Sequence, residues 1–231
     1  MRSKNLNKDL VLDEDMAYLI GVIIGDGHIS NNTKSKTDLS KDYQINIELT
    51  NYDYLKEVEL LFKKFVKTKS ATHPLKKREG KKQSWVFRVR NKELYLYLTK
   101  IIGIPCGSKS GRLFIPENIM KGNDAIKKNF ISGFFDTDGG KRGNALGFSM
   151  KSEQLQKDTS NLLKELKIRH YNERWFNKKY QLYYYGIKLS KKFTKMFLYE
   201  VPLRNKSKFN EILNLFNADV PERSNGIEDH S

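Results

Sequence analysis

LIGVIIGDG, at residues 19–27, returns in altered form as ISGFFDTDG at residues 131–139. Each copy is an apolar, helix-like run with a glycine in its middle and an Asp-Gly pair at its end. The two terminal carboxylates, Asp26 and Asp138, fall in the two halves of a chain of 231 residues. A pseudo-symmetric molecule could bring two such helix ends together and place the two acids side by side.

Glycines inside the copies indicate close packing of two helices. Gly21 and Gly25 lie four residues apart and therefore on one helical face; Gly133 and Thr137 hold these places in the second copy. Glycine costs roughly 1 kcal/mol inside a helix relative to alanine, and close approach of a second helix gives a reason for that cost. One copy alone favours an ordinary buried helix that stops at a glycine, whereas two copies in the same element order favour an interface.

The two acids at the helix ends predict a metal-dependent centre. Two carboxylates at close range repel one another unless a cation lies between them. Oxygen ligands select hard ions such as Mg²⁺, which activate water and stabilise the charge that develops in phosphodiester cleavage. Helix capping or a salt bridge is the alternative explanation. Asp136 has Ile24 as its counterpart in the first copy, so we interpret it as a supporting or structural acid.

Composition indicates a folded, basic protein with a polyanionic partner. Hydrophobic residues make up 38% of the chain, which is enough for a core, and 43 Lys and Arg against 27 Asp and Glu give a net charge of +16. Because the charges accompany aromatic residues in strand-like runs, a nucleic acid is favoured over a merely solvated basic surface. The four histidines form no metal-ligand spacing, and no phosphate-binding glycine-rich loop or Walker lysine is present.

Cysteine content and the N-terminal sequence predict an intracellular protein. Cys106 is the single cysteine, so the chain holds no disulfide framework or thiolate zinc site, and we expect it to be a small buried residue. Residues 1–15 carry no secretory signal, and the longest apolar run, residues 16–25, is too short to span a bilayer. We expect no membrane association and a location in the cytoplasm, a nucleoid or an organelle matrix.

Hydrophobic periodicity predicts one order of elements twice: helix, hairpin, helix, hairpin, helix. The predicted helices are residues 13–25, 51–67, 92–102, 124–137, 152–167, 190–199 and 206–216. The predicted hairpins are residues 28–50, residues 70–90, one that turns near residues 141–144, and residues 168–188. The predicted domain boundaries are a basic arm at 1–13, a first half at 14–103, a linker at 104–123, a second half at 124–216 and a polar tail at 217–231.

Polar strand faces are expected to contact the nucleic acid, since a twisted antiparallel ribbon fits the major groove. The side chains suited to contacts with bases are Gln44, Asn46, Glu48, Arg88, Arg90, Arg142, Arg174 and Gln181. The turn lysines expected to hold phosphates are Lys34, Lys36, Lys76, Lys77, Lys81, Lys82, Lys178 and Lys179. For each of these residues, an ordinary solvated surface position is the alternative.

The two copies resemble the signature of LAGLIDADG homing endonucleases, in the single-chain form with two fused halves. The approach to the second copy from Ile115-Pro116-Glu117, and the strand-to-helix passage at residues 148–168, also look like this family. The resemblance covers about residues 14–200. It implies an α+β fold of two pseudo-symmetric αββαββα halves, in which saddle-shaped antiparallel sheets lie along DNA and the two motif helices form the interface.

The family pattern implies the ligands of a divalent cofactor, Mg²⁺, with Mn²⁺ or Ca²⁺ as other occupants. Asp26 and Asp138 would bind the ions, and the backbone carbonyls of Gly25 and Thr137 would complete the cage. Lys151 falls where the family often places a basic residue that polarises the site or its water network.

The first half departs from the family pattern near the end of its second strand. Leu49 occupies the place of a polar residue that is commonly glutamine, so Glu48 or Gln44 is considered in its stead. The periphery of the centre is therefore predicted less completely than the metal ligands.

The resemblance implies a monomer that cuts both strands of a long, asymmetric DNA site, leaves short 3′ overhangs and promotes intron mobility. Two alternatives stay open: an RNA maturase that binds its own intron RNA, and a catalytically silent DNA-binding regulator. The presence of both acids and the lack of a helix-turn-helix module argue against the regulator. The chain begins with Met1, without a splicing Cys or Ser, and does not end in His-Asn, so a free-standing or intron-encoded reading frame is expected.

Overall fold

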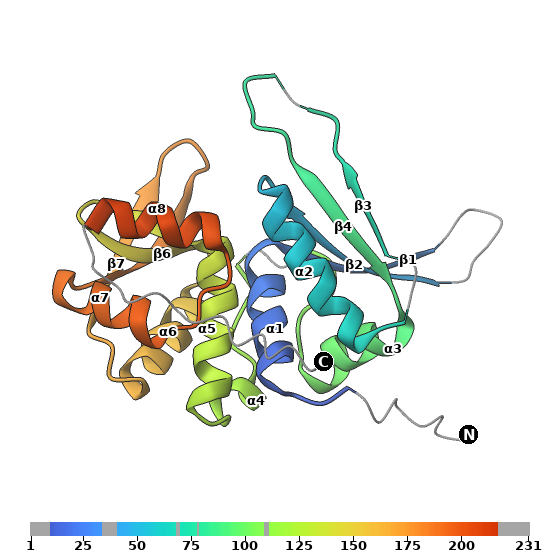
Figure 1. Ribbon diagram of the computed structural model, residues 1–231, viewed down its shortest axis with the longest axis horizontal. Helices are drawn as coiled ribbons and strands as arrows, with labels where there is room; N and C mark the ends of the chain where they lie inside the picture. Colours follow the sequence, from blue (N-terminus) through green and yellow to red (C-terminus); the bar gives the residue numbers. More distant parts are fainter. Residues whose placement is uncertain (1–9, 34–40, 68–69, 78, 109–110, 217–231) are drawn as a thin grey trace, which may run out of the picture.

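The computed structural model describes residues 10–33, 41–67, 70–77, 79–108 and 111–216. Two similar halves lie side by side, with one long helix from each at the centre (Figure 1). The first half contains α1 (Glu14–Asp26), β1 (Gly27–Thr33), β2 (Lys41–Leu49), α2 (Tyr52–Phe65), β3 (Ala71–Pro74), β4 (Trp85–Arg90), α3 (Lys92–Leu96) and the π-helical turn η1 (Tyr97–Ile101). The second half contains α5 (Asp124–Asp138), β5 (Gly139–Arg142), β6 (Ala145–Met150), α6 (Glu153–Glu165), β7 (His170–Asn177), β8 (Leu182–Leu189), α7 (Lys191–Glu200) and α8 (Lys206–Phe216).

The predicted element order and the α+β fold are confirmed, with one addition and two corrections. The predicted linker contains the short helix α4 (Glu117–Met120), which Pro116 precedes and buried Ile119 anchors in the core. Leu10, in the predicted arm, also packs in the core. Cys106, predicted to be buried, is only half-buried: it packs against the margin of the core, and its Sγ atom lies 3.6 Å from the Asn31 side-chain oxygen.

Side-chain caps set where the two central helices begin. Asp13 accepts a hydrogen bond from the backbone N–H of Met16, and Asn123 accepts one from Ile126, so each helix has its first turn satisfied by an N-cap. Both helices are buried along most of their length, which explains why their sequences lack a clear polar face. In the described part of the chain, no helix is long and apolar enough to cross a membrane.

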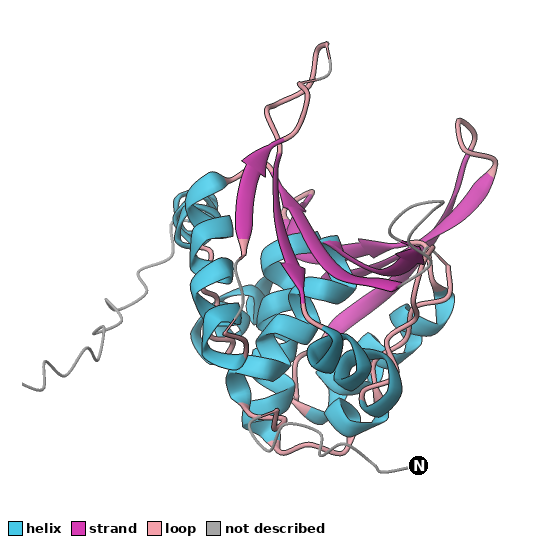
Figure 2. Cartoon of the chain, turned by 90° about the vertical axis from the view of Figure 1, so that its right-hand side faces the viewer, coloured by secondary structure: helices cyan, strands magenta, loops and turns pink. Residues whose placement is uncertain are grey.

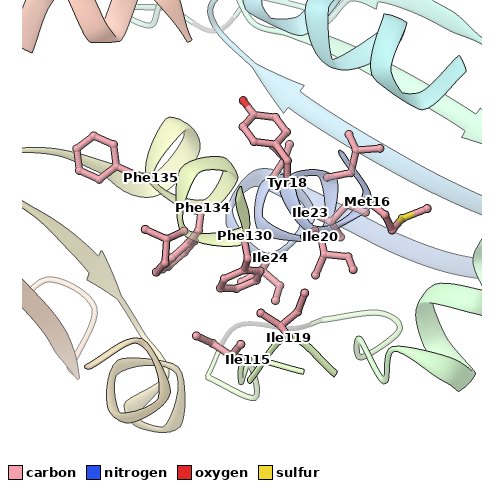
Figure 3. Packing of buried hydrophobic residues seen from close by; sticks show 14 of the residues in the cluster. Met16, Tyr18, Ile20, Ile23, Ile24, Ile115, Ile119, Phe130, Phe134 and Phe135 are labelled. Carbon is pink, nitrogen blue, oxygen red and sulfur yellow. The ribbon is translucent and has the colours of Figure 1, made fainter. Parts of the chain in front are cut away.

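Close contact between α1 and α5 forms the centre of the molecule, and Figure 3 shows their side chains packed together. A Cβ atom added to Gly21 would lie 2.2 Å from the carbonyl oxygen of Phe130. A Cβ atom added to Gly133 would lie 2.0 Å from the carbonyl oxygen of Tyr18. The helices therefore approach backbone to backbone at both glycines, which confirms the predicted interface.

Each half carries one antiparallel sheet of four strands, in the order β1-β2-β4-β3 in the first half and β5-β6-β8-β7 in the second. Figure 2 shows the helices on one side of the sheets and the other side free of helices. The registers correspond, because Gly27 after the first acid pairs with Ile47 and Gly139 after the second pairs with Phe148. In β2 and β4 the alternation buries apolar side chains such as Ile47 and Phe87 under the helices and leaves the two arginines of β4 on the open face.

Candidate metal centre and nucleic-acid surface

The two predicted metal-binding acids are the last residues of the two central helices. Asp26 ends α1 and Asp138 ends α5, and both are exposed. A Cβ atom added to Gly25 would lie 2.0 Å from the Thr137 hydroxyl oxygen and 3.6 Å from the Asp138 carboxyl carbon. The missing side chain at Gly25 thus lets the carboxyl end of α5, with its acid, approach the end of α1.

Two hollows meet at this pair of helix ends, and Gly25 lines both. The larger, of about 620 Å³, holds Asp26 together with Glu48 from β2 and Lys208 from α8. The smaller, of about 270 Å³, holds Asp138 together with Lys151, which follows β6. Each acid therefore shares a hollow with side chains from the sheet of its own half.

The donors at these helix ends suit a hard divalent cation. Asp26 and Asp138 offer carboxylate oxygens, and backbone carbonyls lie beside them, whereas the residues lining the two hollows include no cysteine or histidine, and their one sulfur is the thioether of Met150. Within the described ranges, no cluster of three or more His, Cys, Asp or Glu side chains could hold a metal. The oxygen donors that are present fit an ion that retains several waters and takes few protein ligands, as Mg²⁺ does.

Asp136 lies two residues before the second acid but points into the protein. It is only 2% exposed, and its Oδ2 atom accepts hydrogen bonds from the Tyr18 hydroxyl at 2.7 Å and from the backbone N–H groups of Arg204 and Asn205 at 2.8 and 3.1 Å. Burial raises the pKa of Asp136, and these hydrogen bonds oppose that rise. Asp136 is therefore a structural acid that ties both central helices to the segment before α8.

Lys151 is exposed and lies beside two aromatic rings. Its Nζ atom is 5.7 Å from the centre of the Tyr184 ring and 5.9 Å from that of Tyr180. The shared hollow with Asp138 places its ammonium on the side of the second acid. The strand register makes Thr50 its counterpart in the first half, so the two halves differ at this place.

Among the alternatives for the first-half polar residue, the structure places Glu48 beside Asp26. Glu48 lines the hollow of Asp26 and accepts a hydrogen bond from the Ser84 hydroxyl at 3.0 Å. Leu49 is buried, and Gln44 lies nearer the other end of β2, where it donates to Asp42. Glu48 is thus the polar β2 side chain that shares the first acid's hollow.

The open face of the first sheet carries four of the predicted base contacts in paired positions. Gln44 pairs with Arg90 and Asn46 with Arg88 across β2 and β4. The Arg88 Nε donates to the Asn46 side chain at 2.8 Å. These contacts hold the guanidinium groups on the helix-free face, where a nucleic acid has access to them.

Two of the predicted base contacts, Arg142 and Arg174, lie on opposite faces of the second sheet. Arg142 lies over the Trp175 ring, 4.7 Å from its centre, and donates to Glu173 at 2.9 Å on the open face. Arg174 pairs with Tyr185, whose hydroxyl donates to Glu153 of α6 on the helix side of the sheet. Aromatic residues occupy both faces of β7 and β8, so strand alternation alone did not show which face Arg174 takes.

The remaining predicted contacts lie at hairpin ends, which extend beyond the sheets in Figure 2. The exposed lysines between β3 and β4 are Lys76, Lys77, Lys81 and Lys82. The exposed residues between β7 and β8 include Lys178, Lys179 and Gln181, whose amide donates to the Lys178 carbonyl at 2.6 Å. Lys34, Lys36, the first nine residues of the arm and the tail at 217–231 lie outside the described residues.

Sequence reasoning missed Lys208, which lies at the carboxyl end of α5. Its Nζ atom donates to the carbonyl oxygens of Phe135, Thr137 and Gly139 at 3.0, 3.1 and 2.9 Å. The Thr137 carbonyl, a predicted metal ligand, thus accepts a hydrogen bond from this ammonium. The sequence did hold a signal: a lysine in the first turn of a helix opposes the helix dipole, so Lys208 needs a partner elsewhere.

Comparison with families of known sequence gives one match that spans both halves. A model described as LAGLIDADG-like domain matches residues 13–103 and 125–213. An uncharacterized protein of Methanocaldococcus jannaschii is 28% identical over 149 residues, which are 61% of this chain and 49% of that protein. A replication factor C small subunit of the same organism is 31% identical over 158 residues, 62% of this chain and 8% of that protein. The chain spans about half the length of the first relative and less than a tenth of the second.

Solved structures share the fold at low sequence identity. I-DmoI in complex with DNA and Ca aligns with a TM-score of 0.66 and 21% identity, covering 90% of this chain and 99% of that one. The homing endonuclease I-WcaI bound to its DNA recognition sequence aligns with a TM-score of 0.57 and 16% identity, covering 95% and 96%. The N-terminal LAGLIDADG domain of WhiA aligns with a TM-score of 0.55 and 17% identity, covering 90% and 91%.

Proposed function

The chain belongs to the LAGLIDADG-like family, and from this premise we propose that it is a monomeric endonuclease that uses a divalent metal to cut both strands of a long, asymmetric DNA site. The observation that carries the proposal is the pair of exposed acids, Asp26 and Asp138, at the abutting ends of α1 and α5. I-DmoI and I-WcaI, which share the fold, were solved bound to DNA, and I-DmoI also with Ca or Mn.

In this proposal, DNA lies along the helix-free faces of the two sheets. Arg88, Arg90 and Arg142 face the bases, and the lysines of the hairpin ends hold phosphates on either side. The ends of α1 and α5 then meet the duplex at its middle, where each acid would hold the metal that cuts one strand. Cuts placed across the minor groove would leave short 3′ overhangs and a break that promotes intron mobility.

At each strand, water adds to phosphorus, and the bond between phosphorus and one ester oxygen breaks. A bound Mg²⁺ supplies activation of water and stabilisation of the charge on the phosphate and the leaving oxygen. Asp26 and Asp138 would hold the ion, together with the backbone carbonyls of Gly25 and Thr137. In the second half, the Lys151 ammonium would orient water or the phosphate within the hollow that it shares with Asp138.

The acids are tested by Asp26→Asn and Asp138→Asn. Each substitution keeps the shape of the side chain but removes a charged metal ligand, so we expect double-strand cleavage to be lost while DNA binding is retained. Asp124→Asn is the matched control, because Asp124 is an exposed acid at the opposite end of α5. If either variant of the helix-end acids cuts both strands at the wild-type rate, the shared metal centre is wrong.

The substrate is tested by a cleavage selection. The purified protein is mixed with a large pool of long randomised duplexes, in Mg²⁺ or in EDTA, and the ends are sequenced. We expect Mg²⁺-dependent breaks at one long site with a fixed short 3′ overhang. Selective binding of one duplex without cleavage in any divalent ion would contradict the endonuclease and leave a DNA-binding protein.

A further inference from the structure

Lys208 belongs to α8, but its ammonium group binds the end of another helix, α5. Its three carbonyl partners, those of Phe135, Thr137 and Gly139, all belong to the carboxyl end of α5 or the residue after it. An ammonium group has three N–H donors, and here each finds one acceptor. The last turn of α5 contains no basic residue, so α8 supplies the cation that the negative end of the helix dipole favours.

The start of α8 is fixed so that Lys208 reaches this point. Asp136 accepts from the backbone N–H groups of Arg204 and Asn205, and the Asn205 side chain accepts from the Lys208 backbone N–H at 3.1 Å. The Ser132 hydroxyl donates to the Pro202 carbonyl at 2.6 Å. Residues of α5 therefore hold the segment before α8 at several points, and the position of the ammonium is determined by the helix that it caps.

Lys208 is half-buried, and its surroundings are acidic. Burial lowers the pKa of Lys208, and the carboxylates of Asp136, Asp26 and Asp138 oppose that effect. The Oδ1 atom of Asp136 is buried and has no hydrogen-bond partner within the described residues, so the nearby ammonium compensates its charge. The two helix-end acids are thus within electrostatic reach of a fixed positive charge.

We propose that Lys208 is a positioning residue of the metal centre: it fixes the carboxyl end of α5 and places its ammonium group beside Asp26 and Asp138. This inference rests on the proposed metal-dependent function. The ammonium already donates to the Thr137 carbonyl, so a divalent ion competes with it for that oxygen. Lys208 therefore has two effects: it holds the end of α5 with its predicted metal ligands in place, and it weakens the binding of the ion.

The test measures binding of Tb³⁺ alone, without DNA, by the luminescence that nearby tyrosines sensitise. Tyr54 lines the same hollow as Asp26 and can serve as the sensitiser. Lys208→Met removes the charge and keeps the length of the side chain. We expect Lys208→Met to bind Tb³⁺ roughly tenfold more tightly, as expected when one unit charge near a multivalent ion is removed, and to cut DNA more slowly.

Two further variants separate charge from geometry. Lys206→Gln is the matched control, because it removes one charge from an exposed residue of the same helix, and its Tb³⁺ affinity should equal that of the wild type. Lys208→Arg keeps the charge, but its planar fork cannot match three carbonyls around one nitrogen. We expect Lys208→Arg to keep the wild-type Tb³⁺ affinity and to lose thermal stability.

Unchanged or weaker Tb³⁺ binding by Lys208→Met would overturn the proposal. If Lys208 were only structural, its substitution would disorder the site and the variant would bind the ion less tightly. If Lys208→Met does not fold, the test rests on Lys208→Arg, which keeps the positive charge. Tighter Tb³⁺ binding by Lys208→Arg than by the wild type would overturn the proposal. The result is independent of cleavage. If the wild-type protein cuts no DNA but Lys208→Met still binds Tb³⁺ roughly tenfold more tightly than the wild type, the proposed endonuclease activity is wrong and the proposed role of Lys208 is supported.

Discussion

At the scale of single residues, the surroundings decide what an acid does. Asp136 and Asp138 lie two residues apart on one helix, yet the first is buried among hydrogen-bond donors and the second is exposed at the helix end. The helical rotation of about 200° between two such positions turns their side chains to different sides. Asp138, like Asp26, therefore lies exposed at a helix end, whereas hydrogen-bond donors inside the protein engage the Asp136 Oδ2 atom.

Glu59 shows the same rule away from the helix ends. Its side chain is only 5% exposed, and it accepts hydrogen bonds or ion pairs from Lys56 and Lys63 and a bond from Thr72 of β3 at 2.7 Å. Burial alone raises the pKa of Glu59, but these partners outweigh burial and lower its pKa to about 2. Glu59 thereby fastens the edge strand β3 to α2.

Glu59→Gln tests this role through pH. A folded-state pKa of about 2 lies below the ordinary glutamate value, so the stabilisation is complete above about pH 4.5 and is lost as pH falls towards 2. We expect the variant to lose about 2 kcal/mol of unfolding free energy at pH 7, with a difference that shrinks below pH 4.5. Urea denaturation at several pH values measures it.

The control for Glu59 is Glu117→Gln, which breaks an exposed ion pair with Lys121. Exposed pairs of this kind contribute little, so we expect almost no change at any pH. A Glu59→Gln deficit that stays constant from pH 7 to pH 3 would show that the ionised carboxylate is not the source of the stability.

At the scale of elements, the contact of α1 with α5 determines where the acids lie. Gly21 and Gly133 let the backbones touch in the middle of the helices, and Gly25 faces Thr137 near their ends. Apolar side chains from both helices, including Ile20 and Phe134, fill the space around this contact (Figure 3). The close approach is therefore maintained along the helices up to the two carboxylates.

Gly21→Ala tests the contact. The added methyl group would lie 2.2 Å from the Phe130 carbonyl oxygen and 2.7 Å from the Phe134 nitrogen, both backbone atoms that cannot rotate away. We expect a loss of about 3 kcal/mol in unfolding free energy, as for severe overpacking of a core, and a slower cleavage rate as the helices separate. Chemical denaturation measures the first effect.

Gly140→Ala is the matched control for the helix contact. A Cβ atom added to Gly140, on β5, meets nothing within 4 Å, so we expect the stability to change little. Equal losses in the two variants would mean that the helix contact is looser than the structure shows.

At the scale of the whole molecule, charge and shape act together. The net charge is +16, and arginines and lysines lie on the open sheet faces and at the hairpin ends, opposite the helices. A basic, helix-free surface of this kind attracts phosphates and leaves strand side chains free to reach base edges. The acids at the α1 and α5 ends lie between the two sheets, so DNA on both faces would pass over them.

This arrangement predicts strongly salt-dependent binding. If 6–10 phosphates are contacted, affinity should fall roughly 10³- to 10⁵-fold between 50 and 200 mM salt. Substitution of Lys76 and Lys77 by Gln should lower the slope of log affinity against log salt by about 2, because each lost phosphate contact lowers it by about 1. Fluorescence anisotropy with the selected duplex measures the slope.

Lys121→Gln is the control for salt dependence, since Lys121 follows α4 and pairs with Glu117. It carries the same charge as Lys76 but lies outside the predicted contact surface, so the slope should stay at the wild-type value. If Lys121→Gln also lowers the slope by about 1, as each hairpin lysine is expected to do, net charge rather than the hairpin ends determines binding.

The local sequence pattern was enough to predict the helices and strands, but it predicted only part of the candidate site. The spacing of Leu55, Val58 and Phe62 predicted α2, and the structure buries all three. The same reasoning predicted Asp26 and Asp138 as metal ligands, because each follows an apolar run directly, and the structure places both at the ends of the central helices. It did not resolve the face taken by Arg174, where aromatic residues on both sides of the hairpin hide the alternation.

The amino-acid sequence alone established two repeated halves, two acid-ended helices and a basic strand surface, because hydrophobic periodicity and glycine spacing act between near neighbours in the chain. Only the tertiary structure showed which groups bind Asp136, that Glu48 shares the hollow of Asp26 and that Lys208 caps the helix of the second acid. Lys208 and Thr137 come together through the path of the chain before α8, and such contacts between distant residues depend on packing that no local pattern encodes.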